Sequence, residues 1–248
     1  KPPRKPANRR TSGGAHWIFG THAAVAALQN ENRRIFEVWA TEGFVESHTD
    51  ELSGFDIKVV KRSELDERLP DDAVHQGIAV RTQPLADLDI QDVLETISND
   101  EKACIAILDQ ANDPRNIGAV LRSAAAFGVS CLILQDRNAP PETGVMAKAA
   151  SGALEHVPIV RITNLARTLE ALKEAGFWCV GLDGYADATL AEARLDGRTA
   201  FVFGAEGRGL RRLTRETCDS LVKIPLSEKV ESLNLANAVG ITLYEWVR

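Results

Sequence analysis

The chain has 248 residues, of which 44% are hydrophobic and 26% charged, an ordinary balance for a globular protein of one large or two modest domains. No apolar run approaches the ~18 residues that a membrane span requires, and the basic, proline-bearing start is unlike a signal peptide, so we expect a cytoplasmic protein. The net charge of −6 argues against a protein that coats nucleic acid nonspecifically.

Positive charge is concentrated at the start of the chain. The first ten residues contain five lysines and arginines and no acid, which leaves 24 basic and 35 acidic residues in the remainder, a net charge of −11. A flexible basic arm over residues 1–15 fits either local contact with phosphate groups or a solubilising tail.

Cysteine and histidine spacing indicates no metal site. The four cysteines are far apart, without a CxxC pair, and the five histidines show neither HxH nor HxxxH spacing. We therefore expect buried, reduced, structural thiols and no bound metal.

Residues 16–82 have the pattern of a small α/β unit. The predicted elements are a helix at 21–28 capped by Thr21, strands at 35–40 and 57–60, a helix from Ser63, and a strand at 77–81. Residues 83–98 are acidic, with only a short helix expected near 93–97, and this change in composition predicts a linker.

From residue 99 onward, apolar strands alternate with helices. Strands are predicted at 103–108, 131–134, 157–162, 177–182, 199–203 and 221–224, and helices at 116–127, 145–150, 164–175 and from Ser232 to the end. Fully apolar strands that alternate with helices are typical of a parallel sheet covered on both faces.

Three stretches of the second unit stand out. The first, NIGAVLR at 116–122, predicts a helix capped by Asn116, with Pro114 barring an earlier start. The second, FGAEGRGL at 203–210, follows a buried strand with three glycines that allow close approach to a ligand. The third, IP at 224–225 followed by SLN at 232–234, ends a strand and opens the last helix, so two strand ends and a helix N-terminus form a predicted ligand crevice.

Taken singly, these stretches have ordinary explanations. The glycines fit a simple turn, and a dinucleotide-binding fold is excluded because fewer than forty residues follow Gly209. Taken together, in this order and at these separations, they resemble the three signature motifs of the SpoU (TrmH-like) 2′-O-ribose RNA methyltransferases of the SPOUT superfamily. The first unit, which ends near His75-Gln76-Gly77, is similar to the L30e-like substrate-binding domain of that family.

The resemblance implies a fold and a reaction. It implies an α/β SPOUT-type parallel sheet with a C-terminal deep trefoil knot over residues 99–248, preceded by an L30e-like RNA-binding domain over 16–82. The implied activity is methylation of a ribose 2′-hydroxyl by S-adenosylmethionine, with a guanosine of 23S ribosomal RNA as substrate and a homodimer as the active form. A tRNA ribose methyltransferase and a catalytically silent RNA-binding or ribosome-assembly factor are the alternatives.

The resemblance also implies roles for individual residues. Backbone groups of Gly204, Ile224 and Leu233 would bind the cofactor, and the implied catalytic residues are Asn116, Arg122, Glu206, Ser232 and Asn234. Because a guanidinium stays protonated in proteins, we expect Arg122 to stabilise the developing alkoxide or to hold the adjacent phosphate. Glu206 is equally suited to shaping its loop.

Two features leave alternatives open. Many family members have a glycine in the loop after the IP pair, where this chain has Ser227-Glu228-Lys229, so Glu228 bears on activity. The arginines at 208, 211, 212 and 215 fit either RNA phosphate binding or a solvated helix face.

Overall fold

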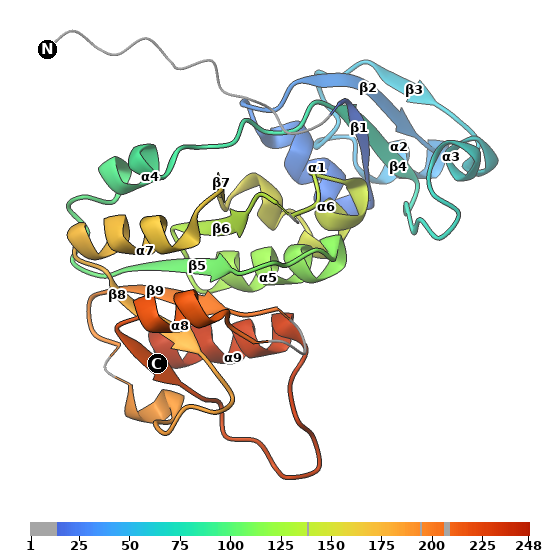
Figure 1. Cartoon of the computed structure of the whole chain (residues 1–248). Helices are drawn as coiled ribbons and strands as arrows, with labels where there is room; N and C mark the ends of the chain where they lie inside the picture. The colour runs from blue at the N-terminus through green and yellow to red at the C-terminus, as the bar shows by residue number, and fades with distance from the viewer. Residues whose placement is uncertain (1–13, 138, 194, 206–208) are drawn as a thin grey trace, which may run out of the picture.

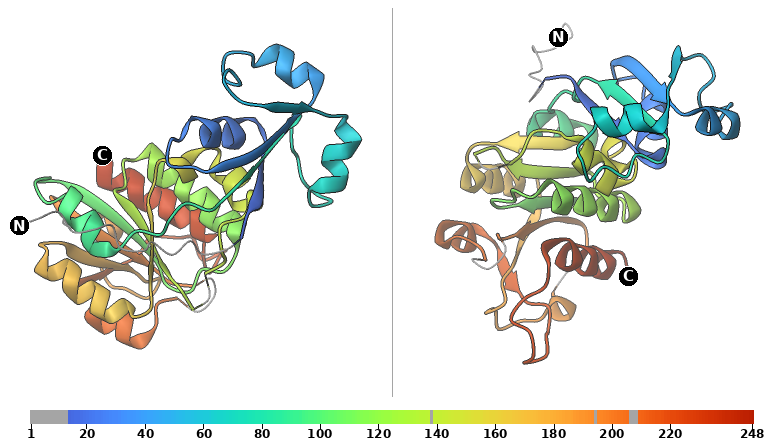
Figure 2. Two further views of the ribbon diagram at one scale, coloured as in Figure 1. Left: turned by 90° about the horizontal axis from the view of Figure 1, so that it is seen from above. Right: turned by 90° about the vertical axis from the view of Figure 1, so that its right-hand side faces the viewer.

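A computed structural model describes residues 14–137, 139–193, 195–205 and 209–248, so Glu206, Arg208 and most of the predicted basic arm lie outside the described residues. The chain forms two α/β units that lie side by side, each built on its own sheet (Figures 1 and 2). Among the described residues, no helix is long and apolar enough to cross a membrane.

The first unit contains a four-stranded mixed sheet in the order β1-β4-β2-β3. Its elements are β1 (His16–Phe19), α1 (Thr21–Gln29), β2 (Ile35–Ala40), α2 (Glu42–Ser47), β3 (Ile57–Val59), α3 (Arg62–Arg68) and β4 (Ile78–Thr82). Strand β4 is antiparallel to β1 and β2, whereas β2 and β3 are parallel. One face packs on α1 and the other on α3, because successive side chains of a strand point to opposite faces.

The second unit contains a six-stranded sheet in the order β10-β8-β9-β5-β6-β7, and every pairing in it is parallel. Its strands are β5 (Ala103–Leu108), β6 (Cys131–Gln135), β7 (Ile159–Ile162), β8 (Trp178–Leu182), β9 (Arg198–Phe203) and β10 (Ser220–Val222). The prediction of a parallel sheet is confirmed, and the six strands lie close to their expected positions.

Helices cover both faces of the second sheet (Figure 2). They are α4 (Ile90–Thr96), α5 (Pro114–Ala126), α6 (Gly144–Ala150), α7 (Leu165–Glu174), α8 (Arg212–Thr217) and α9 (Leu235–Val247), with short 3₁₀ turns at Ala153–Glu155 and Leu190–Glu192. Helices α5, α6 and α9 contribute to the core on one face, and α4 and α7 to the core on the other. Helix α4 lies in the segment predicted to be a linker, so part of that segment packs on the second sheet.

Several predicted helix starts are wrong, and α3, for example, begins at Arg62 with Lys61 as its cap rather than at Ser63. Helix α5 begins at Pro114 and is capped by Asp113, whose side chain accepts a hydrogen bond from the Arg115 N–H. Proline suits the first helical position because its missing N–H would have no partner there. Helix α9 begins at Leu235 with Asn234 as its cap, so Ser232 precedes it. Thr21 is the first residue of α1 rather than its cap.

A buried ionic network joins the two units. The Arg33 side chain is inaccessible to solvent; it binds Glu142 and reaches Glu155 of the second unit at 2.6 Å. His16 Nε2 lies 3.2 Å from the same Glu142 carboxylate. Gly144 packs so closely against β1 that a Cβ atom there would lie 2.1 Å from the Trp17 carbonyl oxygen. The first unit is therefore docked firmly on α6 and is not a freely tethered module.

The trefoil knot remains a prediction, because the strand order does not by itself define how the chain threads.

Candidate active site

The carboxyl ends of four neighbouring strands, β5, β8, β9 and β10, form the edge of the second sheet on which the candidate site is built. The backbone N–H of Asp109, after β5, donates to the Phe203 carbonyl at the end of β9, and that of Asp183, after β8, donates to the Val222 carbonyl at the end of β10. The loops that leave these strands are thereby held side by side. Ligands of open parallel sheets bind at such edges.

The glycine loop after β9 folds back on itself. The Gly209 N–H donates to the Ala205 carbonyl at 2.9 Å, and Gly209 has a φ of +64°, in the region that favours glycine. A Cβ atom on Gly204 would lie 2.1 Å from the Gly209 carbonyl carbon. Any larger residue at 204 would therefore force the loop open. Glu206 lies outside the described residues, and its role stays a prediction.

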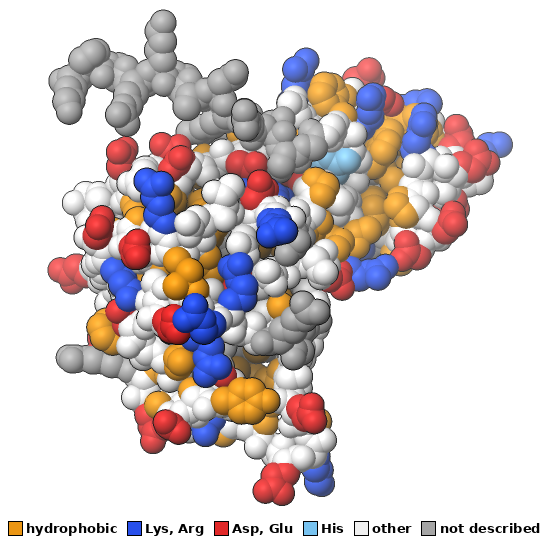
Figure 3. Space-filling view, viewed as in Figure 1, with side chains coloured by type: hydrophobic (Ala, Val, Ile, Leu, Met, Phe, Trp, Pro, Cys, Tyr) orange, Lys and Arg blue, Asp and Glu red, His pale blue; other side chains and the backbone are white. Residues whose placement is uncertain are grey.

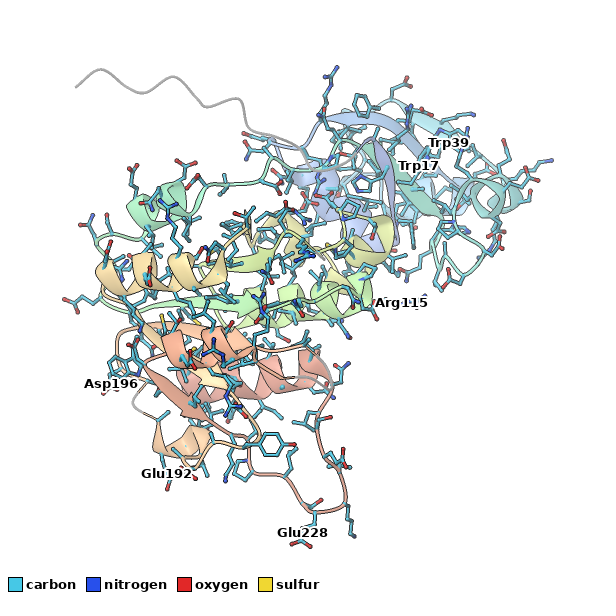
Figure 4. The ribbon with its side chains drawn as sticks, viewed as in Figure 1. Trp17, Trp39, Arg115, Glu192, Asp196 and Glu228 are labelled. Carbon is cyan, nitrogen blue, oxygen red and sulfur yellow. The ribbon has the colours of Figure 1, made fainter. Side chains whose placement is uncertain are left out.

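The loop between β10 and α9 carries the rest of the predicted cofactor site. Ile224 and Leu233 are half-buried, whereas Ser232 is exposed and precedes the helix cap. Glu228 lies at the tip of this loop, far from the sheet (Figure 4). Its side chain is exposed, and its distance from the strand ends separates it from the other site residues.

The first and third motifs meet through two asparagines. Asn234 caps α9 through its Oδ1, which accepts from the Ala236 N–H at 2.9 Å, while its Nδ2 donates to Asn116 Oδ1 at 3.1 Å. Asn116 lies in the first turn of α5, and Ser123 lies on the same side of that helix, facing Gly240 of α9. The packing of α5 against α9 thus joins residues that are 118 positions apart.

Arg122 points to another side of α5. It follows Gly118 by one turn, and Gly118 faces α6, where an added Cβ atom would lie 2.4 Å from the Met146 carbonyl oxygen. The exposed Arg122 side chain lines a hollow of about 520 Å³ between the two units. His22, His48 and His156 line the same hollow. The structure therefore brings Asn116 and Asn234 together and places Arg122 in a separate, interdomain position.

Arginines after the glycine loop hold two buried carboxylates. Arg211 Nε donates to Asp109 Oδ2 at 3.0 Å, and Thr214 Oγ1 donates to the same oxygen at 3.1 Å. Arg215 Nε lies 2.9 Å from Asp183 Oδ2. These ion pairs were not among the predicted contacts. An acidic residue directly after a fully apolar strand was the signal available for both Asp109 and Asp183.

The cysteines are unsuited to nucleophilic or metal chemistry. Cys104, Cys131 and Cys179 are buried and Cys218 is half-buried, and all are free thiols. Burial raises the pKa of Cys131, Cys179 and Cys218 to about 12, so these groups stay protonated near neutral pH. Among the described residues, no group of three His, Cys, Asp or Glu side chains is placed to hold a metal ion.

Comparison with known families gives two matches that together cover most of the chain. Residues 103–244 match the SpoU rRNA Methylase family, and residues 17–88 match the RNA 2′-O ribose methyltransferase substrate-binding family.

Individual relatives are similar to this chain over nearly its full length. The chain is 42% identical to the 23S rRNA (guanosine-2′-O-)-methyltransferase RlmB of Escherichia coli K12, over 93% of this chain and 97% of that protein. It is 41% identical to the RlmB of Vibrio cholerae, with 93% and 96% covered. Among solved structures, the SpoU methyltransferase AviRb from Streptomyces viridochromogenes, in complex with AdoMet, has a similar fold, with a TM-score of 0.79, 24% identity and 94% and 89% coverage.

Proposed function

The chain belongs to the SpoU rRNA Methylase family, and on that premise we propose that it methylates the ribose 2′-hydroxyl of a guanosine in 23S ribosomal RNA, using S-adenosylmethionine. The observation that carries this proposal is the 42% identity to RlmB over 93% of the chain, which spans both units. The test is incubation of the purified protein with S-adenosylmethionine and unmodified 23S ribosomal RNA, followed by mapping of 2′-O-methylated nucleotides. A single new 2′-O-methylguanosine is the expected product.

The residues at the sheet edge fit the cofactor. Gly204 has no side chain where the loop doubles back, and Ile224 and Leu233 offer backbone groups with apolar side chains, which suits a ligand held mainly by main-chain contacts. We propose that these three residues bind S-adenosylmethionine. When bound, the cofactor supplies a methyl group made electrophilic by a sulfonium sulfur.

We propose that Asn116 and Asn234 position the acceptor ribose. Their hydrogen bond fixes the side chains of both residues, and the capping bond from Ala236 further restricts Asn234. A pre-oriented amide pair can hold a hydroxyl at a defined place without reorganising when the substrate arrives. Ser232, two residues before the cap, and Glu206 stay as further candidates for contact with the substrate or cofactor.

The position of Arg122 favours one of its two predicted roles. Arg122 lines the hollow between the RNA-binding unit and the catalytic unit, where a nucleic acid backbone bound to both units would cross. We propose that its guanidinium holds a phosphate next to the reacting ribose, because such forked donors match phosphate geometry. That contact keeps the 2′-hydroxyl positioned for methyl transfer.

The two family matches support the proposed division of the chain. Residues 16–82 would form the RNA-binding domain, 83–98 the connection and 99–248 the catalytic domain, after a basic arm at 1–15. Ribosomal RNA as substrate also favours the cytoplasm as the working compartment.

A second copy of the chain is proposed to pack on α9. Its exposed side carries Ile241, Tyr244 and Val247, which are 43%, 56% and 42% exposed. They recur at a spacing of three residues and therefore lie along one side of the helix. An apolar stripe of this kind on the last helix suits a symmetric dimer contact.

The alternatives give distinct outcomes in the methylation assay. Methylation of tRNA but not of 23S ribosomal RNA would favour the tRNA enzyme. Binding of RNA and cofactor without methyl transfer would favour the catalytically silent factor. That alternative was suggested by Glu228, which stands in a loop where many family members have a glycine. The exposed position of Glu228 at its loop tip favours an active enzyme.

A further inference from the structure

One face of the first sheet carries a row of aromatic and basic side chains. Trp17 of β1 lies opposite Arg81 of β4, which in turn lies opposite Glu37 of β2. Residues directly opposite each other in a sheet point to the same face, so these three side chains form one row. In the next row on that face, Trp39 lies opposite Lys58 of β3.

The cations of this face lie over its rings. Lys58 Nζ is 3.8 Å from the centre of the Trp39 ring, and the Arg68 guanidinium, from α3, is 5.0 Å from the same ring and 6.0 Å from that of Trp17. The two tryptophan rings meet edge to face at 5.3 Å. Figure 4 shows Trp17 and Trp39 as neighbours on the sheet.

A break in the strand register adds a third ring. The pairing of β2 with β4 shifts between Ile35 and Glu37, which leaves Phe36 without an opposite residue. Such irregularities change the direction in which a side chain points. The Phe36 ring lies between two arginines, with the Arg34 and Arg81 guanidinium carbons 5.1 and 5.7 Å from its centre, and it is 41% exposed.

The basic side chains gather on this face although the unit as a whole is acidic. Residues 14–88 contain 7 lysines and arginines and 13 aspartates and glutamates, a net charge of −6. Four of those seven cations, Arg34, Lys58, Arg68 and Arg81, lie over the three rings. Cation–ring contacts of real strength occur about once in 70–80 residues, so four cations in one unit of this size is a marked concentration.

Three acidic residues near this face are already engaged. Arg81 Nη1 lies 2.6 Å from Glu37 Oε1, and Trp39 donates to the other carboxylate oxygen. The hydrogen bond from Arg81 lowers the pKa of Glu37. On α3, Glu64 accepts from the Lys61 N–H, and Asp66 binds His75. The exposed apolar surface flanked by Lys and Arg is visible over the first unit in Figure 3.

We propose that this aromatic-basic face, made of Trp17, Arg34, Phe36, Trp39, Lys58, Arg68 and Arg81, binds unpaired nucleotides of the RNA substrate. The exposed Phe36 ring, the half-buried Trp17 ring and the outer faces of the guanidinium groups are available for stacking with bases, and the same cations pair with phosphates. Trp39, which is 7% exposed and packs against α3, holds Lys58 and Arg68 in place from beneath rather than meeting a base itself. The face would thus grip a loop or bulge of RNA while the catalytic unit acts on a nearby ribose. This inference rests on the proposed function, because it names the RNA-gripping surface of the same enzyme.

Unpaired RNA explains this face better than a protein partner or a duplex. Four cations beside rings are complementary to phosphate charge, whereas a protein contact of this area would favour fewer charges at its centre. In a duplex the faces of the bases are stacked on one another and inaccessible to protein rings.

The test uses the full-length protein and an unstructured RNA of about 12 nucleotides, with binding followed by fluorescence anisotropy. Phe36→Leu keeps an apolar side chain but removes the ring, and is expected to weaken binding about tenfold. Arg68→Gln is expected to weaken binding and to lower the salt dependence by about 0.7 in the log–log slope. Arg62→Gln is the matched control, because Arg62 is an exposed arginine of the same helix α3 that lies over none of these three rings; it should bind as the wild type does.

The outcomes separate this inference from the proposed function. Tighter binding of the single strand than of the same sequence in a duplex, together with losses in Phe36→Leu and Arg68→Gln, supports the inference even if no methyl transfer is detected. Wild-type binding by both variants, with native circular dichroism and thermal unfolding, overturns it even if methylation is normal. Preference for the duplex, or a change in oligomeric state rather than in RNA affinity, also overturns it.

Discussion

Asn234 Nδ2 donates a hydrogen bond to Asn116 Oδ1 at 3.1 Å, which links the cap of the last helix to the first turn of α5. Since Asn234 Oδ1 simultaneously accepts from the Ala236 N–H, one side chain has both a structural and a positioning role. The two roles can be separated by mutation.

Asn234→Ser is expected to preserve the helix cap and reduce methylation by about tenfold or more. Serine accepts the capping hydrogen bond as well as asparagine does, but it lacks the amide that reaches Asn116. The measurements are single-turnover methylation and thermal unfolding. Asn164→Ser is the control, because Asn164 caps α7 in the same way, through the Arg167 N–H, away from the site. Equal activity of both variants would contradict the positioning role.

Arg122→Ala is expected to cut turnover by about 100-fold while leaving cofactor affinity nearly unchanged. Arg122→Lys should recover only part of the rate, because lysine keeps the charge but loses the forked geometry. Single-turnover kinetics at saturating cofactor, with calorimetry of S-adenosylmethionine binding, give both quantities. Arg167→Ala, at an exposed position of α7, serves as the control. A wild-type rate for Arg122→Ala would remove Arg122 from the site.

Arg33→Ala is expected to destabilise the fold by about 3–5 kcal/mol, because it leaves Glu142 and Glu155 buried without their shared cation. Combining Arg33→Met with Glu142→Gln and Glu155→Gln should restore part of that loss by removing the unpaired charges. Denaturant unfolding measures both variants. The adjacent Arg34→Ala, at an exposed position, should change stability far less. Equal losses at 33 and 34 would argue against the buried network.

Acid is expected to weaken the contact between the two units. Burial opposes ionisation of Glu142, but the hydrogen bond from His16 and the charge of Arg33 outweigh it, so the pKa of Glu142 is below its ordinary value of 4.5. A carboxyl whose pKa is lowered by folding contributes its full stability above 4.5 and loses it as the pH falls below that value and through the lowered pKa. Unfolding free energies measured between neutral pH and pH ~3 should fall less steeply in Glu142→Gln than in the wild type. Glu46→Gln, at an exposed position, should retain the wild-type slope.

Ile241→Lys is expected to convert a homodimer into a monomer, because it places a charge within the exposed apolar stripe of α9. Sedimentation at micromolar concentration is the measurement. Leu213→Lys is the control, since Leu213 is 57% exposed on α8 and lies outside that stripe. A wild-type protein that sediments as a monomer would contradict the dimer.

The sequence by itself determined the parallel sheet of the second unit. Strands such as Ala103–Leu108 are apolar at every position, because residues facing one core alternate with residues facing the other, and only a strand buried on both faces has this pattern. The three motifs, in order and spacing, were equally visible, and they identified the family that the comparisons show. Local signals were weaker: the prediction that Pro114 delays the start of α5 is wrong, because proline is well suited to the first helical position, which here follows the cap residue Asp113.

Only the tertiary structure decided which side chains meet. The bond between Asn116 and Asn234 spans 118 positions and depends on how α5 packs against α9, which no local propensity specifies. The separate position of Arg122 follows from the helical turn that directs it toward α6 and the first unit. The same is true of the buried Arg33: nothing in the sequence distinguishes it from the exposed Arg34 beside it, because burial depends on contacts made by residues more than a hundred positions away.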